Sequence, residues 1–591
     1  MSVALLIEEK KRVSNGSDPN NWNPYMEEVF DELGIAASVY RTEEELLRDL
    51  QGKKCVVLTD SDLSEKAFLK LSEWVEKGSV LIGFQTKGAD PLFGIEDAGE
   101  LKQGDDPFTI NGYISLKKKE YLPVEEAYKH TLPVISPVRR ILPKDAEVIG
   151  EMLTPVSSNI FQGNSEYAAI TVKPKGKGFC FYFSYGLAQT VCVIHQGRPV
   201  DRDYDQDGMY RTGDGIVLTS AHDLSLPYAD YHLYILQYMT DKAGIPSKHF
   251  LPPADGQISD LLLHYGGDDE ADPSGIQRKA MEFMKSRGLP YHFNIMPNKD
   301  ITGFEVDKEL YDEIRRNGQE CSLHFNFLKI REFLTKEEFD QQLDLYEKYY
   351  GETPVVTVNH CLIFRGWTEQ ARWASERGIK GDNSRAHTRL MPEANPVNVF
   401  GLAFGTTYPH FVYDDHLHGN RRLPYTYIPI AFYEARVRID EHHEKDIKRL
   451  WDILQKAVDN AWTMNMFFHP VYIARTPECT EAIDQLLKFI EQTGYRSVHM
   501  GNDKLCLWWF DRSKSEVITE KQTEKELVLK VSATNKEGLV IRIPDSLGFN
   551  VCFVDEKKTV CERRKIAGRY CLLAVIPQGV HQVVLKREVP L

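Results

Sequence analysis

The sequence predicts a multidomain α/β protein with an N-terminal doubly wound α/β domain, a central irregular (β/α) barrel and a small C-terminal β-sandwich. Its 591 residues are too many for one hydrophobic core. Short apolar runs alternate with amphipathic stretches over most of the chain, which indicates parallel strands joined by helices. The last part carries only short β-like runs at the spacing of a sandwich. We therefore expect three domains, at residues 1–250, 251–508 and 512–591.

The N-terminal part begins with apolar runs that are separated by helix-like stretches, at residues 3–7, 55–59 and 79–84. Extended runs between about residues 110 and 220 are separated by Gly, Pro and Asn, and we expect them to add strands to the same domain. An amphipathic helix is predicted at residues 227–243, where Gly244 and Pro246 end it. The first domain boundary is therefore expected near residue 250.

From residue 256 to about 506 the alternation is more regular, with eight or so strand–helix repeats over about 250 residues. The clearest strands are predicted at residues 258–265, 291–296, 321–325 and 354–359. This size and rhythm are those of a (β/α) barrel, complete or irregular. Because catalytic residues of such barrels lie at the carboxyl-terminal ends of the strands, we expect a site among the residues that follow these runs.

The composition excludes several classes of protein. Hydrophobic residues make up 42% and aromatic residues 11% of the chain, which is typical of a globular protein and not of a disordered one. Lys and Arg number 72 against 87 Asp and Glu, and the resulting net charge of −15 repels phosphate backbones, so we expect no nucleic-acid partner. No apolar run approaches the roughly 18 to 20 residues that a membrane span needs.

The ten cysteines are scattered and include no Cys-x-x-Cys pair, which favours reduced thiols over a disulfide scaffold. The apolar run at residues 3–7 is too short for a signal peptide, and acidic residues follow it directly. We therefore expect a cytoplasmic protein. A homo-oligomer is one option for its assembly.

Three carboxylates follow the first predicted barrel strand. The run at residues 258–265 ends in two glycines and then Asp268, Asp269 and Glu270. Like charges this close raise each other's pKa unless a cation or a general-base role uses them. An acidic cluster at a helix N-terminus, before Pro273, is the alternative interpretation. The two glycines favour a site, because they let a ligand or metal approach the backbone closely.

Three histidines also follow predicted strands, namely His324, His360 and His469. Taken singly, each is more often a hydrogen-bonded packing residue than a ligand. Together with the carboxylates they form the residue set of a catalytic metal site of the zinc type, which keeps one position open for water. A remaining Asp and His would then serve as general base and general acid.

Residues 258 to about 500 resemble the polysaccharide deacetylases, metal-dependent carbohydrate esterases with an irregular (β/α) barrel. The resemblance lies in three segments, residues 264–269 in place of a T-F-D-D-G motif, residues 318–324 leading to the first metal histidine, and Phe467-Phe468-His469-Pro470. It implies a divalent metal, zinc above all. It further implies Asp268 as base, Asp269 and His324 on the metal, Arg365 holding the base, and His469 as acid.

The sequence departs from that family at one metal ligand. The family has a second histidine four residues after the first, and here Leu328 stands at that position. We expect His360 to replace it, with Asn326 as the alternative. Trp367 and Tyr425 are expected near the barrel mouth, where their rings would stack on a sugar.

Residues 1 to about 245 resemble the class I glutamine amidotransferase fold, whose active members place a nucleophilic Cys in a glycine-flanked elbow after a strand. The elbow-like segment here, residues 83–88, has neither Cys nor Ser at its crest. Cys55 lies inside an earlier predicted strand and is expected in the core. We therefore expect no catalysis from this domain.

These observations lead to one functional hypothesis and two rivals. The first is a metal-dependent hydrolase that removes acetyl groups from an N- or O-acetylated oligo- or polysaccharide. The second keeps the barrel but makes it a glycosidase with two carboxylates, Asp269 or Glu270 paired with Glu434. The third is a carbohydrate-binding or scaffold protein without activity, suggested by the missing metal histidine.

Overall fold

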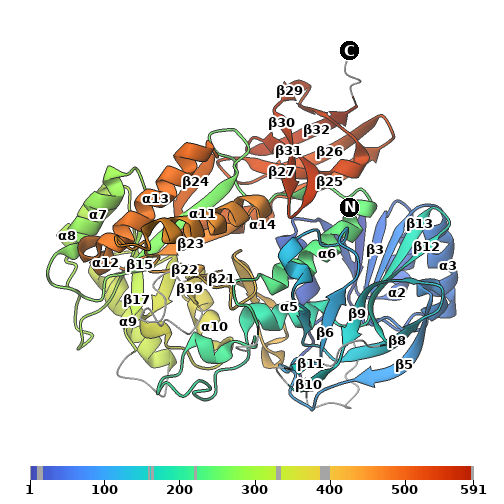
Figure 1. The fold of residues 1–591 in the computed structure, drawn as a ribbon, viewed down its shortest axis with the longest axis horizontal. Helices are drawn as coiled ribbons and strands as arrows, with labels where there is room; N and C mark the ends of the chain where they lie inside the picture. The colour runs from blue at the N-terminus through green and yellow to red at the C-terminus, as the bar shows by residue number, and fades with distance from the viewer. Residues whose placement is uncertain are drawn as a thin grey trace.

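The computed structural model describes residues 2–8, 18–157, 160–161, 166–218, 222–327, 335–386 and 400–587. Helices and strands form three units that follow one another along the chain (Figure 1). The first, from blue to green, holds a large mixed sheet; the second, from green to orange, holds a curled sheet; and the third, in red, is a sandwich. The predicted fold class, multidomain α/β, is confirmed.

The N-terminal sheet has nine strands in the order β2-β1-β3-β4-β13-β12-β9-β6-β7. Its first five strands are parallel, at Ala37–Tyr40, Val3–Leu6, Cys55–Thr59, Val80–Phe84 and Gly178–Phe183. The other four pair antiparallel, at Ala168–Lys175, Glu147–Leu153, Gly112–Leu116 and Leu132–Val134. These are the additional strands that the extended runs predict. Two small antiparallel pairs lie beside them, β5 (Ile95–Leu101) with β8 (Val138–Pro143) and β10 (Pro155–Ser157) with β11 (Ile160–Phe161).

Helices cover both faces of this sheet because successive side chains of a strand point to opposite sides. In β1, Val3 and Leu5 pack with α1 (Tyr25–Glu32), α5 (Leu187–Gln196) and α6 (Tyr228–Lys242). Ala4 and Leu6 pack on the other side with α2 (Glu43–Arg48) and α3 (Glu65–Glu76). The short helix α4 (Asp90–Phe93) completes that second layer.

The central sheet follows the order β20-β21-β19-β18-β17-β16-β15-β23-β22, and β24 also pairs with β15. Its strands lie at His410–Tyr413, Arg422–Pro429, Gly381–Arg385, Val356–Asn359, Glu320–Phe325, His292–Ile295, Leu261–Asp268, Thr463–Phe467, Phe432–Tyr433 and Ser497–Gly501. All neighbours except β20 and β21 are parallel. No pairing among the described strands joins β21 to β22, so the barrel is irregular.

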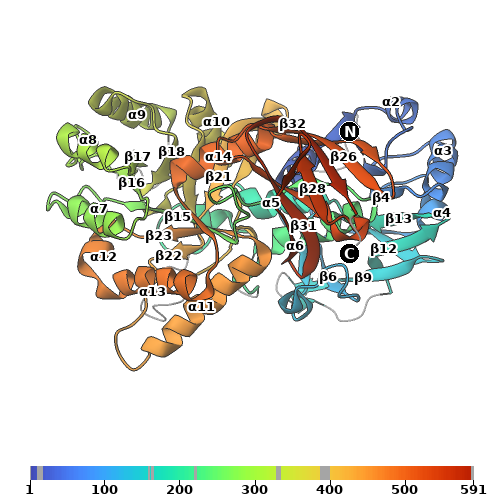
Figure 2. The same ribbon diagram turned by 90° about the horizontal axis from the view of Figure 1, so that it is seen from above.

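Helices surround this curled sheet on its outside (Figure 2). They are α7 (Ile276–Ser286), α8 (Lys308–Arg316), α9 (Lys336–Tyr350), α10 (Glu369–Glu376), α11 (His443–Asn460), α12 (Pro470–Arg475), α13 (Pro477–Thr493) and α14 (Asn502–Lys514). Strand β15 is buried over its whole length, as a strand covered on both faces must be. The middle of the sheet is therefore buried, and side chains that follow the strands lie at its carboxyl-terminal end.

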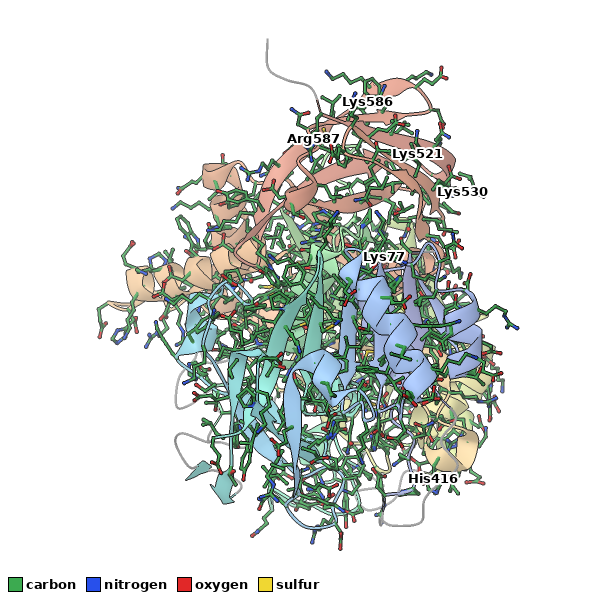
Figure 3. The ribbon with its side chains drawn as sticks, turned by 90° about the vertical axis from the view of Figure 1, so that its right-hand side faces the viewer. Lys77, His416, Lys521, Lys530, Lys586 and Arg587 are labelled. Atoms are coloured by element: carbon green, nitrogen blue, oxygen red, sulfur yellow. The ribbon has the colours of Figure 1, made fainter. Side chains whose placement is uncertain are left out.

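The C-terminal unit is a sandwich of two antiparallel sheets. One contains β25 (Glu516–Gln522), β26 (Glu526–Ala533), β32 (Gly579–Lys586), β28 (Val551–Val554) and β29 (Lys557–Thr559). The other contains β14 (Ser247–Lys248), β27 (Leu539–Pro544), β31 (Arg569–Ile576) and β30 (Cys561–Ile566). Strand β14 belongs to the segment between the N-terminal unit and the first barrel strand, far from the rest of the sandwich in sequence. Figure 3 shows the sandwich, with Lys521, Lys530 and Lys586 labelled on it, above the N-terminal unit.

A buried polar junction joins the three units. Lys248 Nζ lies 3.0 Å from Asp31 Oδ1 of α1 and donates to the carbonyl of Arg512 of α14 at 2.9 Å. Arg512 in turn donates to the carbonyls of Glu32 at 2.9 Å and His249 at 2.8 Å. Because β14 belongs to the sandwich, these contacts tie the first helix, the last barrel helix and the sandwich together.

One hydrophobic core runs through the first two units, since it includes both Val3 of β1 and Trp509 of α14. The domain limits 1–250, 251–508 and 512–591 therefore stay predictions. Cys55 is buried in β3, as expected, and burial raises the pKa of its thiol to about 12. Within the described ranges, every helix is too short or too polar to cross a bilayer.

We predict that Lys248→Met lowers the free energy of unfolding by about 3 kcal/mol, because it leaves the buried Asp31 carboxylate without one of its cations. Urea denaturation measures this change. Lys77→Met, at the exposed end of α3 (Figure 3), is the control and should change stability by less than about 0.5 kcal/mol. Equal stability of the Lys248→Met protein and its parent would contradict the structural role of the junction.

Candidate functional site

The carboxyl-terminal ends of the parallel barrel strands bring distant side chains to one edge of the sheet. Asp268 ends β15, His324 lies near the end of β17, His360 follows β18 and His469 follows β23. Gly267 allows β15 to approach the end of β23 closely, because a Cβ there would collide with the carbonyl of Phe468. This close approach places the Asp268 segment and His469 side by side.

Glu270 lies at the centre of the cluster. Its Oε2 lies 3.0 Å from His360 Nε2, and its Oε1 lies 3.2 Å from His469 Nε2 and 3.9 Å from His324 Nε2. A left-handed backbone conformation, with φ of 58°, turns Glu270 back over the strand end. Ligand atoms of Glu270, His324 and His360 all lie within 4.8 Å of one another. A single ion of ordinary coordination distance fits between such atoms.

His324 has the form that a metal ligand requires. It is fully buried, and its Nδ1 lies 3.3 Å from the carbonyl oxygen of Val358. Burial and the neighbouring His360 lower its pKa to about 3, so the ring is neutral. With the proton on Nδ1, Nε2 keeps a lone pair directed at Glu270, and no hydrogen-bond partner among the described residues uses it. This unpartnered nitrogen is the observation that fits a metal.

The other two residues of the cluster, Glu270 and His360, form an ion pair. Burial disfavours the imidazolium of His360, yet Cys361 and Glu270 outweigh it and raise its pKa to about 10. Burial likewise disfavours the Glu270 carboxylate, but its contacts with His360 and His469 hold the pKa of Glu270 well below its usual range. A bound cation would take the place of these protons on the same atoms.

Asp268 lies beside the cluster with one oxygen anchored. Its Oδ1 accepts a hydrogen bond from Asn294 Nδ2 at 2.8 Å, while Oδ2 lies 3.5 Å from His324 Nε2 and 3.8 Å from His469 Nε2. Burial raises the pKa of Asp268 to about 7, since desolvation outweighs the nearby His469. A carboxyl group with a pKa near neutrality is suited to accept a proton.

His469 is oriented by a second carboxylate. Glu434, which follows β22, accepts from the His469 backbone N–H at 2.8 Å, and its Oε1 also contacts His469 Nδ1. Burial disfavours the imidazolium, but the carboxylates of Glu434 and Glu270 outweigh it and hold the pKa of His469 well above its usual range. The ring therefore presents a protonated Nε2 to the cluster.

Asp269, predicted as a metal ligand, has other contacts in the structure. Asp269 does not face the histidines: its Oδ1 accepts from the backbone N–H of Met296 at 2.8 Å and of Ala271 at 3.2 Å. Strand β15 ends at Asp268, and the left-handed turn at Glu270 brings the Glu270 side chain, and not that of Asp269, toward the histidines. The carboxylate that lies with His324 and His360 in this structure is that of Glu270.

Arg365 and Asn326 also lie elsewhere than expected. The Arg365 guanidinium lies over the Tyr210 ring, 4.8 Å from its centre, and the side chain that donates to Asp268 is Asn294. Asn326 faces the loops around β16, where its Nδ2 donates to the carbonyl of Pro297 at 3.4 Å. Leu328 lies outside the described residues. His360, the other residue predicted for that position, lies with His324 and Glu270 in one cluster.

The two aromatic residues expected to bind a sugar are packing residues. Trp367 is buried, donates from Nε1 to the carbonyl of Gly197 at 3.0 Å, and meets Trp22 edge-on at 5.7 Å. It therefore packs between the barrel and the N-terminal unit. Tyr425 is buried within the barrel, with its ring 6.0 Å from that of Tyr427. Neither ring offers an exposed face for a sugar.

Two residues of the site had no assigned role in metal hydrolysis from the sequence. Glu434 was expected only as a glycosidase carboxylate, although it follows the apolar run Ala431-Phe432-Tyr433 as the other site residues follow theirs. That shared signal identifies it as a strand-end residue. Asn294 lies inside β16, where its burial and its contact with Asp268 depend on the neighbouring strand.

No protein-family model and no curated protein matches this sequence. Among solved structures, a protein described as a polysaccharide deacetylase from Mycobacterium smegmatis has a TM-score of 0.31 and 12% identity, over 44% of this chain and 94% of that one. Puue allantoinase gives 0.30 and 12% over the same shares. A catalytic mutant of Gan42B, a GH42 β-galactosidase from G. stearothermophilus, gives 0.24 and 16% over 31% of this chain. This chain spans only 27% of that galactosidase's length. Likenesses at this level show no shared function.

We predict that Glu270→Gln loses bound divalent metal whereas Asp269→Asn keeps it, because Glu270 faces His324 and His360 whereas Asp269 accepts from backbone amides. Elemental analysis of the purified variants measures metal per chain. Asp269→Asn also serves as the matched control, since it makes the same chemical change one residue away. Loss of metal from Asp269→Asn with retention by Glu270→Gln would restore the ligand assignment that the sequence predicted.

Proposed function

We propose that this protein is a metal-dependent hydrolase that removes acetyl groups from an N- or O-acetylated oligo- or polysaccharide. One observation carries the hydrolase proposal: Glu270, His324 and His360 bring their ligand atoms within 4.8 Å of one another, and the His324 Nε2 in that cluster is buried without a hydrogen-bond partner. The acetylated sugar as substrate rests on the resemblance of the strand-end segments to polysaccharide deacetylases.

Glu270, His324 and His360 would hold the metal, and this set of one carboxylate and two imidazoles suits zinc. When bound, such an ion polarises a carbonyl and makes its water a nucleophile near neutral pH. The set resembles catalytic zinc sites, in which three protein ligands leave a further position open. About a third of the Glu270 side chain is exposed, so the cluster is reached from solvent.

Asp268 would act as the general base. Asn294 fixes its Oδ1, which leaves Oδ2 directed at the space between His324 and His469. A pKa of about 7 means that the ionised form is populated at neutral pH while proton transfer remains favourable. The base therefore takes a proton on Oδ2 while Oδ1 keeps its hydrogen bond.

His469 would act as the general acid toward the leaving amine or alkoxide. Glu434 holds Nδ1 and so fixes the orientation of the ring, as a carboxylate does for a catalytic histidine in a triad. The protonated Nε2 lies 3.8 Å from Asp268 Oδ2. Base and acid thus lie on two sides of the same small space, as cleavage of an amide or ester requires.

The glycosidase hypothesis has less support from this geometry. Glu434, one of its two carboxylates, contacts His469, and Asp269 accepts from two backbone amides. An enzyme with two catalytic carboxylates needs no metal. Chelator treatment therefore distinguishes it from a metal-dependent deacetylase, and a binding protein without activity would release no acetate under either condition.

We also propose that the N-terminal unit has an amidotransferase-like fold without catalysis of its own. Gln85 occupies the crest after β4 with φ of 50°, the strained conformation of a nucleophile elbow, but carries an amide. A cytoplasmic location is part of the same proposal. It is supported by the ten cysteines, all of which are free thiols.

The direct test is acetate release from acetylated oligosaccharides, with N-acetylated chitooligosaccharides and O-acetylated xylooligosaccharides as probes. We expect release that a chelator abolishes and zinc restores. Asp268→Asn should lower kcat by about 10²- to 10⁴-fold with metal content unchanged, because it removes the base and none of the ligands. Release that persists in chelator, or full activity of Asp268→Asn, would contradict the proposed mechanism.

A second prediction concerns pH. Activity requires protonated His469, so kcat/KM falls as the pH rises through the pKa of that ring. Since Glu434 raises this pKa, Glu434→Gln lowers it and should move the alkaline limb of the profile to lower pH. Glu481→Gln, which removes a carboxylate from His443 at the surface, is the control. If the decrease of kcat/KM at high pH occurs at the same pH in Glu434→Gln as in the parent, His469 is not the general acid.

A further inference from the structure

A second cluster of titratable side chains lies far from the strand ends, where the N-terminal helices meet the barrel. Glu32 ends α1, His195 lies near the end of α5, and Asp230 lies in the first turn of α6. All three are at most 1% exposed, and their ligand atoms lie within 4.8 Å of one another. The proposed hydrolase mechanism uses none of them.

Nearly every polar atom of this cluster lacks a partner. Both carboxylate oxygens of Glu32, both of Asp230, and Nε2 of His195 have no hydrogen bond to any described residue. His195 Nδ1 lies 2.9 Å from the hydroxyl of Tyr25. His195 Nδ1 also lies 4.0 Å from Glu32 Oε2, so it is the ring nitrogen that faces this carboxylate. When Nε2 carries the proton, the lone pair of Nδ1 is the one that an ion in the cluster would take.

The groups around the cluster do not compensate its charge. Arg512 is a cation close enough to act on Glu32, but it donates to the carbonyls of Asp31, Glu32 and His249 and to neither carboxylate of the cluster. Burial raises the pKa of Asp230 well above its usual range, and Thr406 and Thr407 beside it offset this only in part. No described group makes a hydrogen bond of good geometry to either of its oxygens. Buried carboxylates without a cation or donor are costly, and coordination of a metal is one way in which proteins satisfy them.

We propose that Glu32, His195 and Asp230 bind a structural divalent metal ion at the junction of α1, α5 and α6. Two carboxylates and one imidazole form a donor set that first-row metals such as zinc accept. Because the cluster is closed to solvent, the ion has no access to a substrate. This proposal is independent of the proposed hydrolase activity.

Such an ion would fix how the N-terminal unit sits on the barrel. The His195 ring stacks on His410 of β20, with ring centres 4.4 Å apart, so the ligand on α5 already contacts a barrel strand. Three helices would share one cation at this point. Because the ligands are buried, the ion would enter during folding, and metal binding would contribute to the stability of the folded state.

The test is elemental analysis of chains folded with zinc, which separates the two metal sites by variant. We expect about two ions in the parent, one in His324→Gln, one in His195→Gln and none in the double variant. Glu28→Gln is the matched control, because Glu28 is also buried on α1 but accepts from the Phe411 backbone N–H at 2.8 Å. It should keep both ions.

The outcomes distinguish the two proposals. Metal content that His195→Gln leaves unchanged would overturn the junction site, whatever His324→Gln does. Metal lost in His195→Gln and retained in His324→Gln would support the junction site and overturn the barrel site. A metal-free junction whose three groups are neutral would appear as no metal at all in His324→Gln.

A second measurement does not depend on the folding of a junction variant. The His324→Gln protein, whose barrel site is disabled, is refolded with zinc or with a chelator, and its thermal midpoint is compared. A higher midpoint with zinc is expected, because the metal binds the folded state alone. Equal midpoints would overturn the junction site.

Discussion

Charge that is buried in this protein must be compensated, and this constraint shapes both the barrel edge and the contacts between units. Removing a carboxylate from water costs several kcal/mol unless a cation or donors replace the water. Where the three units meet, the charge of the Asp31 carboxylate is compensated by Lys248 and Arg422. At the strand ends Glu270 lies among three histidines, and it favours the protonated forms of two of them, His360 and His469. The positions of the units and the chemistry of the site therefore follow from one requirement.

The parallel strands supply the geometry that meets this requirement at the site. Asp268 and His469 are 201 residues apart in sequence, yet β15 and β23 are neighbours and end at the same edge. Gly267 permits that proximity, and the left-handed turn at Glu270 returns a carboxylate over the strand end. His324 and His469 differ because a different partner contacts the second ring nitrogen of each: a carbonyl for His324 and a carboxylate for His469.

The sequence predicted those features that follow from the periodicity of its apolar residues and from the order of its strands. The three-unit α/β fold is one, and the strand-end positions of His324, His360 and His469 are another, because apolar runs that precede them mark buried strands. The choice between Asp269 and Glu270 was not predictable, since it depends on where the strand's alternation ends and on a left-handed turn. Trp367 likewise gives no sequence signal that the N-terminal unit covers it, and Glu32, His195 and Asp230 come from three separate helices.

The central claim is that the barrel edge is a metal site built from Glu270, His324 and His360. Anomalous X-ray diffraction at the zinc edge, from crystals grown with zinc, tests it most directly. The account predicts an anomalous peak about 2.0 to 2.2 Å from Nε2 of His324, Nε2 of His360 and an oxygen of Glu270, with Asp269 still on its backbone amides. A structure with zinc in excess, no peak at this position and the Glu270–His360 ion pair intact would contradict it.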